Sequence, residues 1–260
     1  MSDFLDCVQI QYTHVENPIL LVYNALKYFN YKPIKNYKTM ERLEDLFLEG
    51  IKIYQDDELY RFTSDSVLLS KFTKVKKGDV VADFCSGSGI VGFHLYGLNK
   101  NLIKSVSFFE MQKPLYELSK KSIELNNLGE IFNAENVRLQ DLGSKYAGKF
   151  SLITCNPPYM PIGKGFIDEK DCIAVCRTEL TLPLTDLVSA ISTSLKFGGR
   201  VNLVHRADRL VEVITELKQK NIEPKTLQFV SGGNKEPYLF LMEGVKGGKS
   251  GLKVLPTIIN

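Results

Sequence analysis

Short apolar runs alternate along this chain with stretches in which apolar residues recur at helical spacing. The runs predict strands at 79–84, 104–110, 135–140, 149–155, 199–204, 225–230 and 237–243. The helical spacing predicts helices at 89–98, 113–126, 183–196 and 206–220. Because alternating strands and helices build a mostly parallel sheet with helices on both faces, the pattern predicts an α/β fold.

The last two predicted strands are connected only through residues 231–237. A connection of this length is too short for the crossover helix that parallel strands need, so the last strand is expected to pair antiparallel, as a hairpin. The expected sheet therefore has seven strands, with an antiparallel last strand. Ligands of such sheets bind at the carboxyl ends of the parallel strands, so the residues at those ends are the candidates for a functional site.

The apolar run that ends at Cys155 is followed by Asn156, Pro157, Pro158 and Tyr159. The side-chain oxygen of Asn156 and the backbone carbonyl of Pro157 can each accept one N–H of an amine whose lone pair is delocalised into a π-system. The prolines stiffen this segment because their φ is fixed, and Tyr159 can stack on a flipped-out base. The segment therefore indicates methylation of an amino group, with a simple strand-ending turn as the alternative.

A second group of candidates follows the earlier strands. Asp83 precedes a small-residue loop with Gly87 and Gly89, which predicts a strand, a tight loop and a helix start with unpaired N–H groups. Glu110 ends the next strand, where a carboxylate can accept both hydroxyls of a ribose. Asp141 follows the third strand and can accept from an adenine amino group. Together these residues predict a nucleoside cofactor.

The glycine loop also matches the Gly-x-Gly-x-x-Gly fingerprint of dinucleotide-binding proteins through Gly87, Gly89 and Gly92. The carboxylate of Asp83, four residues before the first glycine, would repel an anionic pyrophosphate. S-adenosylmethionine carries a sulfonium cation and a free amine, which an acidic loop suits. Together with Asn156, the loop therefore favours S-adenosylmethionine over a nicotinamide cofactor.

Several motifs occur in an order typical of one family. They are Met40-Glu-Arg-Leu-Glu-Asp-Leu, Phe62-Thr-Ser-Asp-Ser-Val-Leu-Leu, Asp83-Phe-Cys-Ser-Gly-Ser-Gly, Asn156-Pro-Pro-Tyr, Cys176-Arg-Thr-Glu-Leu, Leu203-Val-His-Arg-Ala-Asp-Arg-Leu and Lys246-Gly-Gly-Lys-Ser-Gly-Leu-Lys-Val-Leu-Pro. Over about residues 40–260 the chain resembles the bacterial tRNA(Val) adenine N6-methyltransferases, which are class I S-adenosylmethionine-dependent enzymes. The resemblance implies a seven-stranded Rossmann-like sheet and methylation of the adenine just 3′ of the anticodon.

The resemblance also implies cofactor contacts before the first strand of the sheet. In that family this segment closes over the methionine end of the cofactor, which makes Phe62, Thr63 and Asp65 candidate ligands. The residues themselves offer a second interpretation, because Ser64 or Asp65 also fits the N-cap of a helix that runs through Lys71.

Basic residues provide the candidate contacts to RNA. Arg177 and Arg206 fall in an arginine-rich part of the chain, and Lys246 opens a glycine-rich tail that could follow an RNA backbone. Pro158 and Tyr159 would contact the substrate base. Two alternatives stay open: Arg206 could pair locally with Asp208 at a solvated helix start, and the tail could be a loose terminus.

The composition limits the classes of protein to which this chain can belong, but it does not identify a function. A chain of 260 residues, 44% hydrophobic, can form one large α/β domain, expected at 40–260, with residues 1–39 as an N-terminal extension of unknown role. A net charge of +3 permits nucleic-acid binding without requiring it. No apolar run is long enough to span a membrane and no signal pattern opens the chain, so a cytoplasmic protein is expected. The five cysteines predict neither a disulfide framework nor a metal site.

The expected partner is tRNA, and a monomer is favoured. Other substrates remain open, because glutamine methyltransferases of release factors and guanine methyltransferases of ribosomal RNA have similar Asn-Pro-Pro-aromatic motifs. A catalytically silent module that binds S-adenosylmethionine or RNA is a further alternative. The presence of both the Asn156 motif and the cofactor loop argues against it.

Overall fold

The structure is a computed structural model, and it describes residues 41–48, 50–56, 59, 64–159 and 182–260. The predicted site residues Phe62, Thr63 and Arg177 lie outside the described residues, as does the extension at 1–39. Within the described ranges, no helix is long and apolar enough to cross a membrane.

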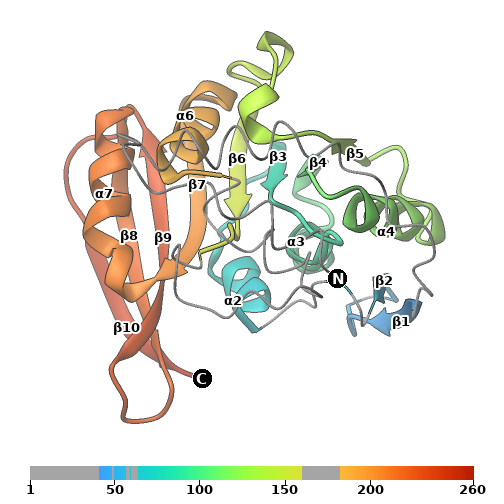
Figure 1. Cartoon of the computed structure of the whole chain (residues 1–260), viewed down its shortest axis with the longest axis horizontal. Coiled ribbons are helices and arrows are strands. Elements are labelled where there is room, and N and C mark those ends of the chain that lie inside the picture. The colour runs from blue at the N-terminus through green and yellow to red at the C-terminus, as the bar shows by residue number, and fades with distance from the viewer. Residues whose placement is uncertain (1–40, 49, 57–58, 60–63, 160–181) are drawn as a thin grey trace, which may run out of the picture. The chain divides into compact units, whose positions relative to one another are not determined.

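One sheet of eight strands organises the described part of the chain, in the order β10, β8, β9, β7, β6, β3, β4, β5 (Figure 1). The strands are β3 (Asp79–Phe84), β4 (Ile103–Glu110), β5 (Phe132–Asn136), β6 (Phe150–Cys155), β7 (Leu195–Arg206), β8 (Ile222–Ser231), β9 (Pro237–Lys246) and β10 (Lys253–Ile259). All neighbours are parallel except at β9, which is antiparallel to both β7 and β8. A separate antiparallel hairpin consists of β1 (Glu41–Asp45) and β2 (Lys52–Asp56).

The predicted α/β fold with a mostly parallel sheet is confirmed, and the predicted antiparallel strand is β9. The sheet has one strand more than expected, because β10 adds to its edge in parallel with β8. This finding also excludes a loose terminus at 253–259. The residues of β10 were not predicted as a strand, because Pro256 interrupts them and their apolar side chains do not alternate with polar ones.

The predicted strand at 135–140 is wrong over most of its length. β5 begins earlier, at Phe132, whose ring packs 5.0 Å from that of Phe93 between centroids. The strand ends at Asn136, because the side-chain amide of this residue donates to the carbonyls of Glu110 and Met111 at 2.9 and 3.0 Å. Asp141 therefore lies in a 3₁₀ turn, η1 (Leu139–Asp141), instead of at a strand end.

Each predicted helix is present. The helices are α2 (Ser64–Phe72), α3 (Ile90–Asn99), α4 (Lys113–Leu125), α6 (Leu184–Ser194) and α7 (Leu210–Gln219), with two further 3₁₀ turns at η2 (Ser144–Tyr146) and η3 (Ala207–Arg209). The helix predicted from 206 begins at Leu210, because η3 occupies the residues before it.

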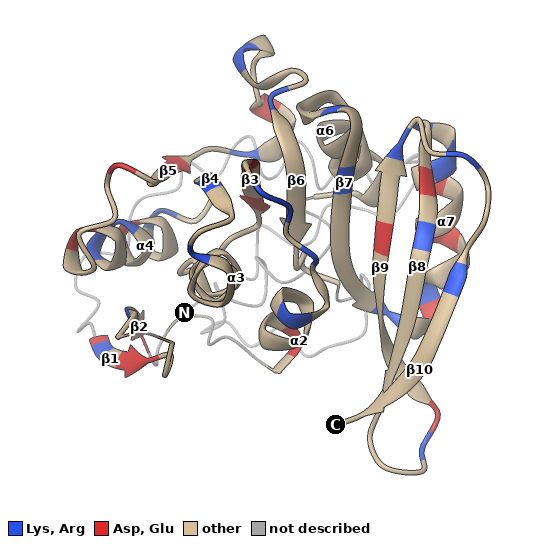
Figure 2. Ribbon diagram, turned by 180° about the vertical axis from the view of Figure 1, so that it is seen from behind, with Lys and Arg blue, Asp and Glu red and all other residues tan. Residues whose placement is uncertain are grey.

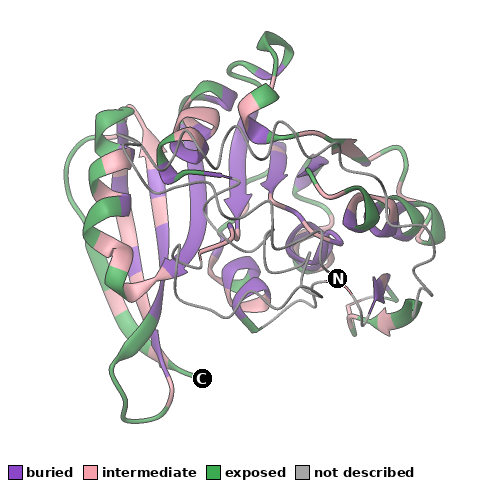
Figure 3. Cartoon of the chain, in the orientation of Figure 1, coloured by how far each residue is buried: buried purple, intermediate pink, exposed green. Residues whose placement is uncertain are grey.

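The core has two layers, one on each face of the sheet. Since side chains alternate along a strand, Val81 faces a cluster with Leu69 of α2 and Phe93 of α3. Ala82 faces the other cluster, which includes Val188 of α6 and Leu217 of α7. Figure 3 shows that burial is concentrated in the central strands. The sheet is thus held between helices, and its strand ends are the places where side chains can reach a ligand.

Candidate functional site

The carboxyl ends of β6, β3, β4 and β5 lie side by side at one edge of the sheet. The parallel registers pair Cys155 with Phe84 and Phe84 with Phe109, and the next pair of strands ends at Glu110 and Asn136. Side chains that end or follow these strands therefore meet at this edge. The structure gathers five of the predicted site residues here: Asp83, Gly87, Gly89, Glu110 and Asn156.

The loop after β3 turns tightly through left-handed backbone conformations. Cys85, Gly87 and Gly89 have φ values of 56°, 57° and 92°. At Gly89 a Cβ would lie 2.9 Å from ring atoms of both Phe108 and Phe93, so only glycine fits there. The loop consequently enters α3 with its backbone close against the sheet.

Glu110 connects this loop to the end of β4. Its Oε2 accepts from the Gly87 N–H at 2.8 Å, and its Oε1 accepts from the Gln112 N–H at 2.8 Å. Burial raises the pKa of Glu110, while backbone hydrogen bonds from Gln112, Gly87 and Met111 oppose the shift. Each oxygen keeps a further lone pair, so the carboxylate can still accept from ribose hydroxyls.

Both carboxyl oxygens of Asp83 are hydrogen-bonded within the protein. Its side chain is only 1% exposed, and its two oxygens accept from the Gly92 N–H of α3 at 3.1 Å and from the Thr154 hydroxyl of β6 at 2.8 Å. The pKa of Asp83 is raised to about 7. Burial is the main cause and the charge of Glu110 adds to it, while the hydrogen bonds from Thr154 and Gly92 oppose the shift. Because a carboxyl group already occupies a donor at the start of α3, this helix end does not suit the pyrophosphate of a dinucleotide. Direct contact of Asp83 with a cofactor stays a prediction.

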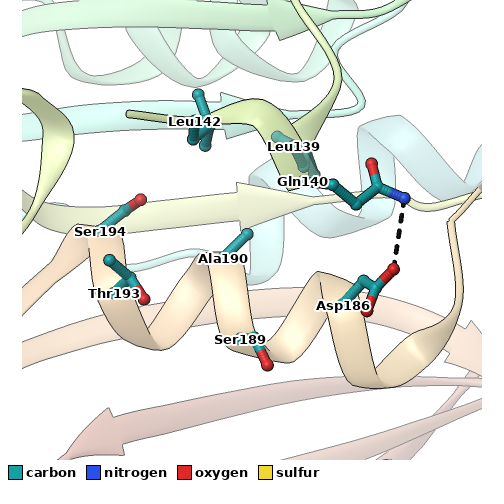
Figure 4. Close-up of a pocket in the computed structure, with 8 residues that line it drawn as sticks. All are labelled: Leu139, Gln140, Leu142, Asp186, Ser189, Ala190, Thr193 and Ser194. Atoms are coloured by element: carbon teal, nitrogen blue, oxygen red, sulfur yellow. Dashed lines mark hydrogen bonds between the residues drawn. The ribbon is translucent and has the colours of Figure 1, made fainter. Parts of the chain in front are cut away.

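Asp141 is exposed on η1, beside the start of α6. Its neighbour Gln140 donates to Asp186 of α6 at 3.5 Å. Between η1 and α6 lies a pocket of 280 Å³ (Figure 4), lined by Leu139, Gln140, Leu142, Asp186, Ser189, Ala190, Thr193 and Ser194. None of these lining residues is a predicted site residue, so this pocket does not coincide with the predicted site.

Asn156 has two ends with different surroundings. Its Nδ2 donates to Ser66 Oγ of α2 at 3.1 Å. Its Oδ1 is buried and has no hydrogen-bond partner among the residues that the structure describes. Leaving a buried acceptor unpaired costs about 1–3 kcal/mol. Such an acceptor is available for an N–H of a substrate.

Tyr159 is held from two sides. Its hydroxyl donates to Asp65 Oδ2 at 2.6 Å, and its ring lies 5.8 Å from that of His205 between centroids. His205 in turn stacks near Phe240 at 6.2 Å. Burial lowers the pKa of His205 to about 4, and the charge of Arg209 adds to the shift. The imidazole is therefore neutral at pH 7, and its Nδ1 accepts from the Arg206 N–H at 3.0 Å.

Several residues at this edge were missed from the sequence. Ser66 falls within the motif at 62–69, but nothing in the sequence distinguished it as a site residue, because one serine in a helix looks like any other. Gln55 of β2 donates to the Ser88 hydroxyl in the glycine loop and is only 1% exposed. The sequence could have indicated Gln55. It follows Ile51 and Ile53 at strand spacing, so it is a polar residue on an otherwise apolar face of the strand.

Two of the predicted basic contacts, Arg206 and Lys246, bond to groups within the protein. Arg206 donates to Asp208 at 2.7 and 3.1 Å, so the local pairing considered from the sequence is confirmed. Lys246 donates to the carbonyls of Ser192 and Leu195 at 2.6 and 2.9 Å, where α6 ends. Arg206, at the carboxyl end of β7, lies beside Leu239 near the start of β9, whereas Lys246 is at the other end of β9. Lys246 therefore lies away from the strand ends that hold Asn156. Figure 2 shows basic and acidic positions mixed along α4 and α7.

The chain is similar in sequence to known methyltransferases. Residues 62–168 match the family model of the methyltransferase small domain. The chain is 32% identical over 124 residues to a protein of Methanocaldococcus jannaschii assigned as a protein N5-glutamine methyltransferase, in a match that covers 47% of the chain and 57% of that protein. It is 24% identical over 197 residues to the tRNA1(Val) (adenine(37)-N6)-methyltransferase of a Flavobacteriaceae bacterium, covering 70% of the chain and 81% of that protein.

Among solved structures, the chain is similar to a protein from Agrobacterium tumefaciens that is predicted to be an O-methyltransferase. The TM-score is 0.59 at 16% sequence identity, and the match covers 75% of this chain and 86% of the other. A similarity at 16% identity shows the fold alone. The fold is thus that of known methyltransferases, and the edge that holds Glu110 and Asn156 is the one where such α/β sheets bind ligands.

Proposed function

Because residues 62–168 match the family model of the methyltransferase small domain, we propose that the chain uses S-adenosylmethionine to methylate the exocyclic N6 amine of an adenine in RNA. The specific substrate that we propose is the adenine just 3′ of the anticodon in tRNA(Val). A relative with that assigned activity matches over 70% of the chain. The proposal makes tRNA the partner of this protein.

The observation that carries this proposal is the unpaired Oδ1 of Asn156. It is a buried acceptor at the carboxyl end of β6, and the other end of the same amide is already bonded to Ser66. An exocyclic amine needs acceptors for its hydrogens before its delocalised lone pair becomes nucleophilic. The backbone carbonyl of Pro157 would accept the second hydrogen, and the ring of Tyr159 would stack on the base.

The residues at the edge fit the cofactor. Glu110 would accept from the ribose, and the loop from Cys85 to Gly89 leaves room for close backbone approach. When bound, S-adenosylmethionine supplies an electrophilic methyl group on a sulfonium. Asn156 and Pro157 draw out the lone pair of the substrate nitrogen and orient it. The nitrogen loses a proton to water after it has become cationic, so none of these residues has to act as a base.

A protein glutamine is the second candidate substrate. The relative from Methanocaldococcus jannaschii supports it at 32% identity over 124 residues. A carboxamide nitrogen has the same delocalised lone pair, so the same two acceptors would serve it. A glutamine has no ring, so this substrate would gain less from Tyr159 than an adenine.

The test is methyl transfer from labelled S-adenosylmethionine to unmodified total tRNA, ribosomal RNA and release factor, followed by analysis of the modified nucleoside or residue. We expect N6-methyladenosine in tRNA. Label in release factor or ribosomal RNA alone would overturn the tRNA substrate.

The matched variant for this assay is Asn156→Ala. Turnover should fall by about 10²-fold or more, because an interaction made mainly in the transition state is lost. The affinity for S-adenosylmethionine, measured by calorimetry, should change little. Equal losses in turnover and cofactor affinity would contradict the role given to Asn156.

A further inference from the structure

The first turn of α2 contacts two of the four residues in the Asn-Pro-Pro-Tyr segment. Ser66 Oγ accepts from Asn156 Nδ2 at 3.1 Å, and Asp65 Oδ2 accepts from the Tyr159 hydroxyl at 2.6 Å. These contacts join residues 90 and 94 positions apart in the chain. Asp65 and Ser66 are 8% and 2% exposed, and both contacts are partly buried.

We infer that Asp65 and Ser66 are positioning residues, which set the orientation of the Tyr159 ring and of the Asn156 amide for the substrate amine. This inference rests on the proposed function, because it assigns a task to α2 within the same site. It gives Asp65 a different role from the cofactor contact that the family resemblance implies.

Ser66 holds the Nδ2 end of the Asn156 amide in place. An asparagine side chain presents an acceptor at one end and two donors at the other. With Nδ2 bonded to Ser66, the free end of Asn156 is Oδ1, which can accept an N–H. The flipped amide would present donors to a substrate that also presents donors, and the amine could not bind in that state.

Asp65 acts on the position of an aromatic ring. The hydroxyl of Tyr159 is fixed by the Asp65 carboxylate, while His205 lies beside the ring. A ring held at both places is already oriented when a base arrives, so less rotamer freedom is lost on binding. Since one oxygen of Asp65 is bonded to Tyr159 and the other lies 3.4 Å from the Ser64 hydroxyl, its contacts within the protein account for both oxygens.

The packing of α2 keeps this turn in place. Leu69, one turn further along, is fully buried in the cluster between α2, α3 and the sheet. At the start of the helix, the Ser64 hydroxyl accepts from Asn260 Nδ2 at 3.2 Å. The first turn is therefore attached both to the core and to the end of β10, which makes it a rigid support for neighbouring side chains.

The test for Asp65 is a double-mutant cycle of Asp65→Ala with Tyr159→Phe, in the full-length chain, with turnover and S-adenosylmethionine affinity measured separately. Each single variant should lose about tenfold in turnover, because a misplaced ring lowers the fraction of productive complexes. The double variant should lose no more than either single one, since both remove the same bond. Asp65→Asn keeps an acceptor oxygen and should restore most of the turnover.

The cofactor affinity decides between the two roles of Asp65. It should stay within about twofold of the wild type in each of these variants, because the Asp65 carboxylate bonds to Tyr159 and not to the cofactor. A large loss of affinity in Asp65→Asn would show that the charge binds the cofactor, and would overturn the inference. Additive losses in the double variant would also overturn it.

Ser66 is tested by Ser66→Ala against Ser70→Ala. Ser70 is equally buried on the same helix, but its hydroxyl bonds to the Val67 carbonyl and to His94. Turnover should fall by about tenfold or more in Ser66→Ala and should stay near the wild-type value in Ser70→Ala. If the wild type methylates an amine and Ser66→Ala is fully active, the positioning role alone is refuted. If the wild type methylates no amine in RNA or protein, the proposed function is refuted and the inference falls with it.

Discussion

At the scale of single residues, buried polar groups decide what this edge of the sheet can do. Asp83, Glu110 and Asn156 all lie at strand ends, but their surroundings differ. Asp83 has both oxygens bonded within the protein, Glu110 retains acceptor capacity, and Asn156 has an unpaired oxygen. The candidate chemistry therefore depends on which hydrogen bonds are left unmade, more than on which residue types are present.

His205 should make stability depend on pH in a way that the Asp83 carboxyl partly conceals. The pKa of His205 is about 4 in the folded state and near 6.5 when exposed, so the unfolded chain binds a proton that the folded one does not. His205 therefore costs stability as the pH falls from about 6.5 to about 4. Asp83 has the opposite sign, because its pKa of about 7 lets the folded state bind a proton first.

The measurement that separates the two is a comparison of the wild type with His205→Gln. Relative to this variant, the wild type should lose about 2–3 kcal/mol of unfolding free energy between pH 7 and pH 4.5, by the linkage of pKa to stability. Urea unfolding at both pH values would measure it. If the difference between the two proteins does not change with pH, His205 titrates alike in both states and the burial argument is wrong.

At the scale of elements, the loop between β3 and α3 illustrates how packing and backbone act together. Gly89 needs both a left-handed φ of 92° and the space that a Cβ would fill against Phe108 and Phe93. Gly87 needs the left-handed φ of 57° alone, because nothing lies within 4 Å of its would-be Cβ. The start of α3 can lie this close to the two rings because Gly89 has no Cβ.

Gly89→Ala should therefore destabilise the fold by about 2–4 kcal/mol, from backbone strain plus overpacking of two buried rings. The matched control is Gly87→Ala, which should cost about 1–2 kcal/mol from strain alone. Chemical unfolding of both variants measures the difference. Equal losses at the two positions would mean that the rings move aside at little cost.

At the scale of the whole molecule, the site residues that the structure describes all belong to the part of the chain from 41 to 260. The contacts around Asn156 and Tyr159 come from α2, β6 and β7, all after residue 63. The chain at 40–260 should therefore retain the full turnover of the 260-residue protein in the tRNA assay. The full-length protein is the control, with cofactor affinity measured in parallel. A loss of RNA affinity with unchanged cofactor binding would instead make 1–39 an RNA-facing appendage.

The sequence by itself determined the α/β class, the order of most strands and helices, and the strand ends at which Glu110 and Asn156 lie. It could do so because hydrophobic periodicity and glycine loops are local signals. It did not reveal β10, the early end of β5, or the partners of Asp65 and Lys246.

Those features depended on the tertiary structure, for a physical reason. A polar side chain can satisfy its hydrogen bonds with any group that the fold brings near, and Ser66 and Asn156 are 90 residues apart in the chain. The type of a residue states which bonds it can make. Only the packing of α2 against the sheet decided that Asp65 holds Tyr159, and that one oxygen of Asn156 is left for a substrate.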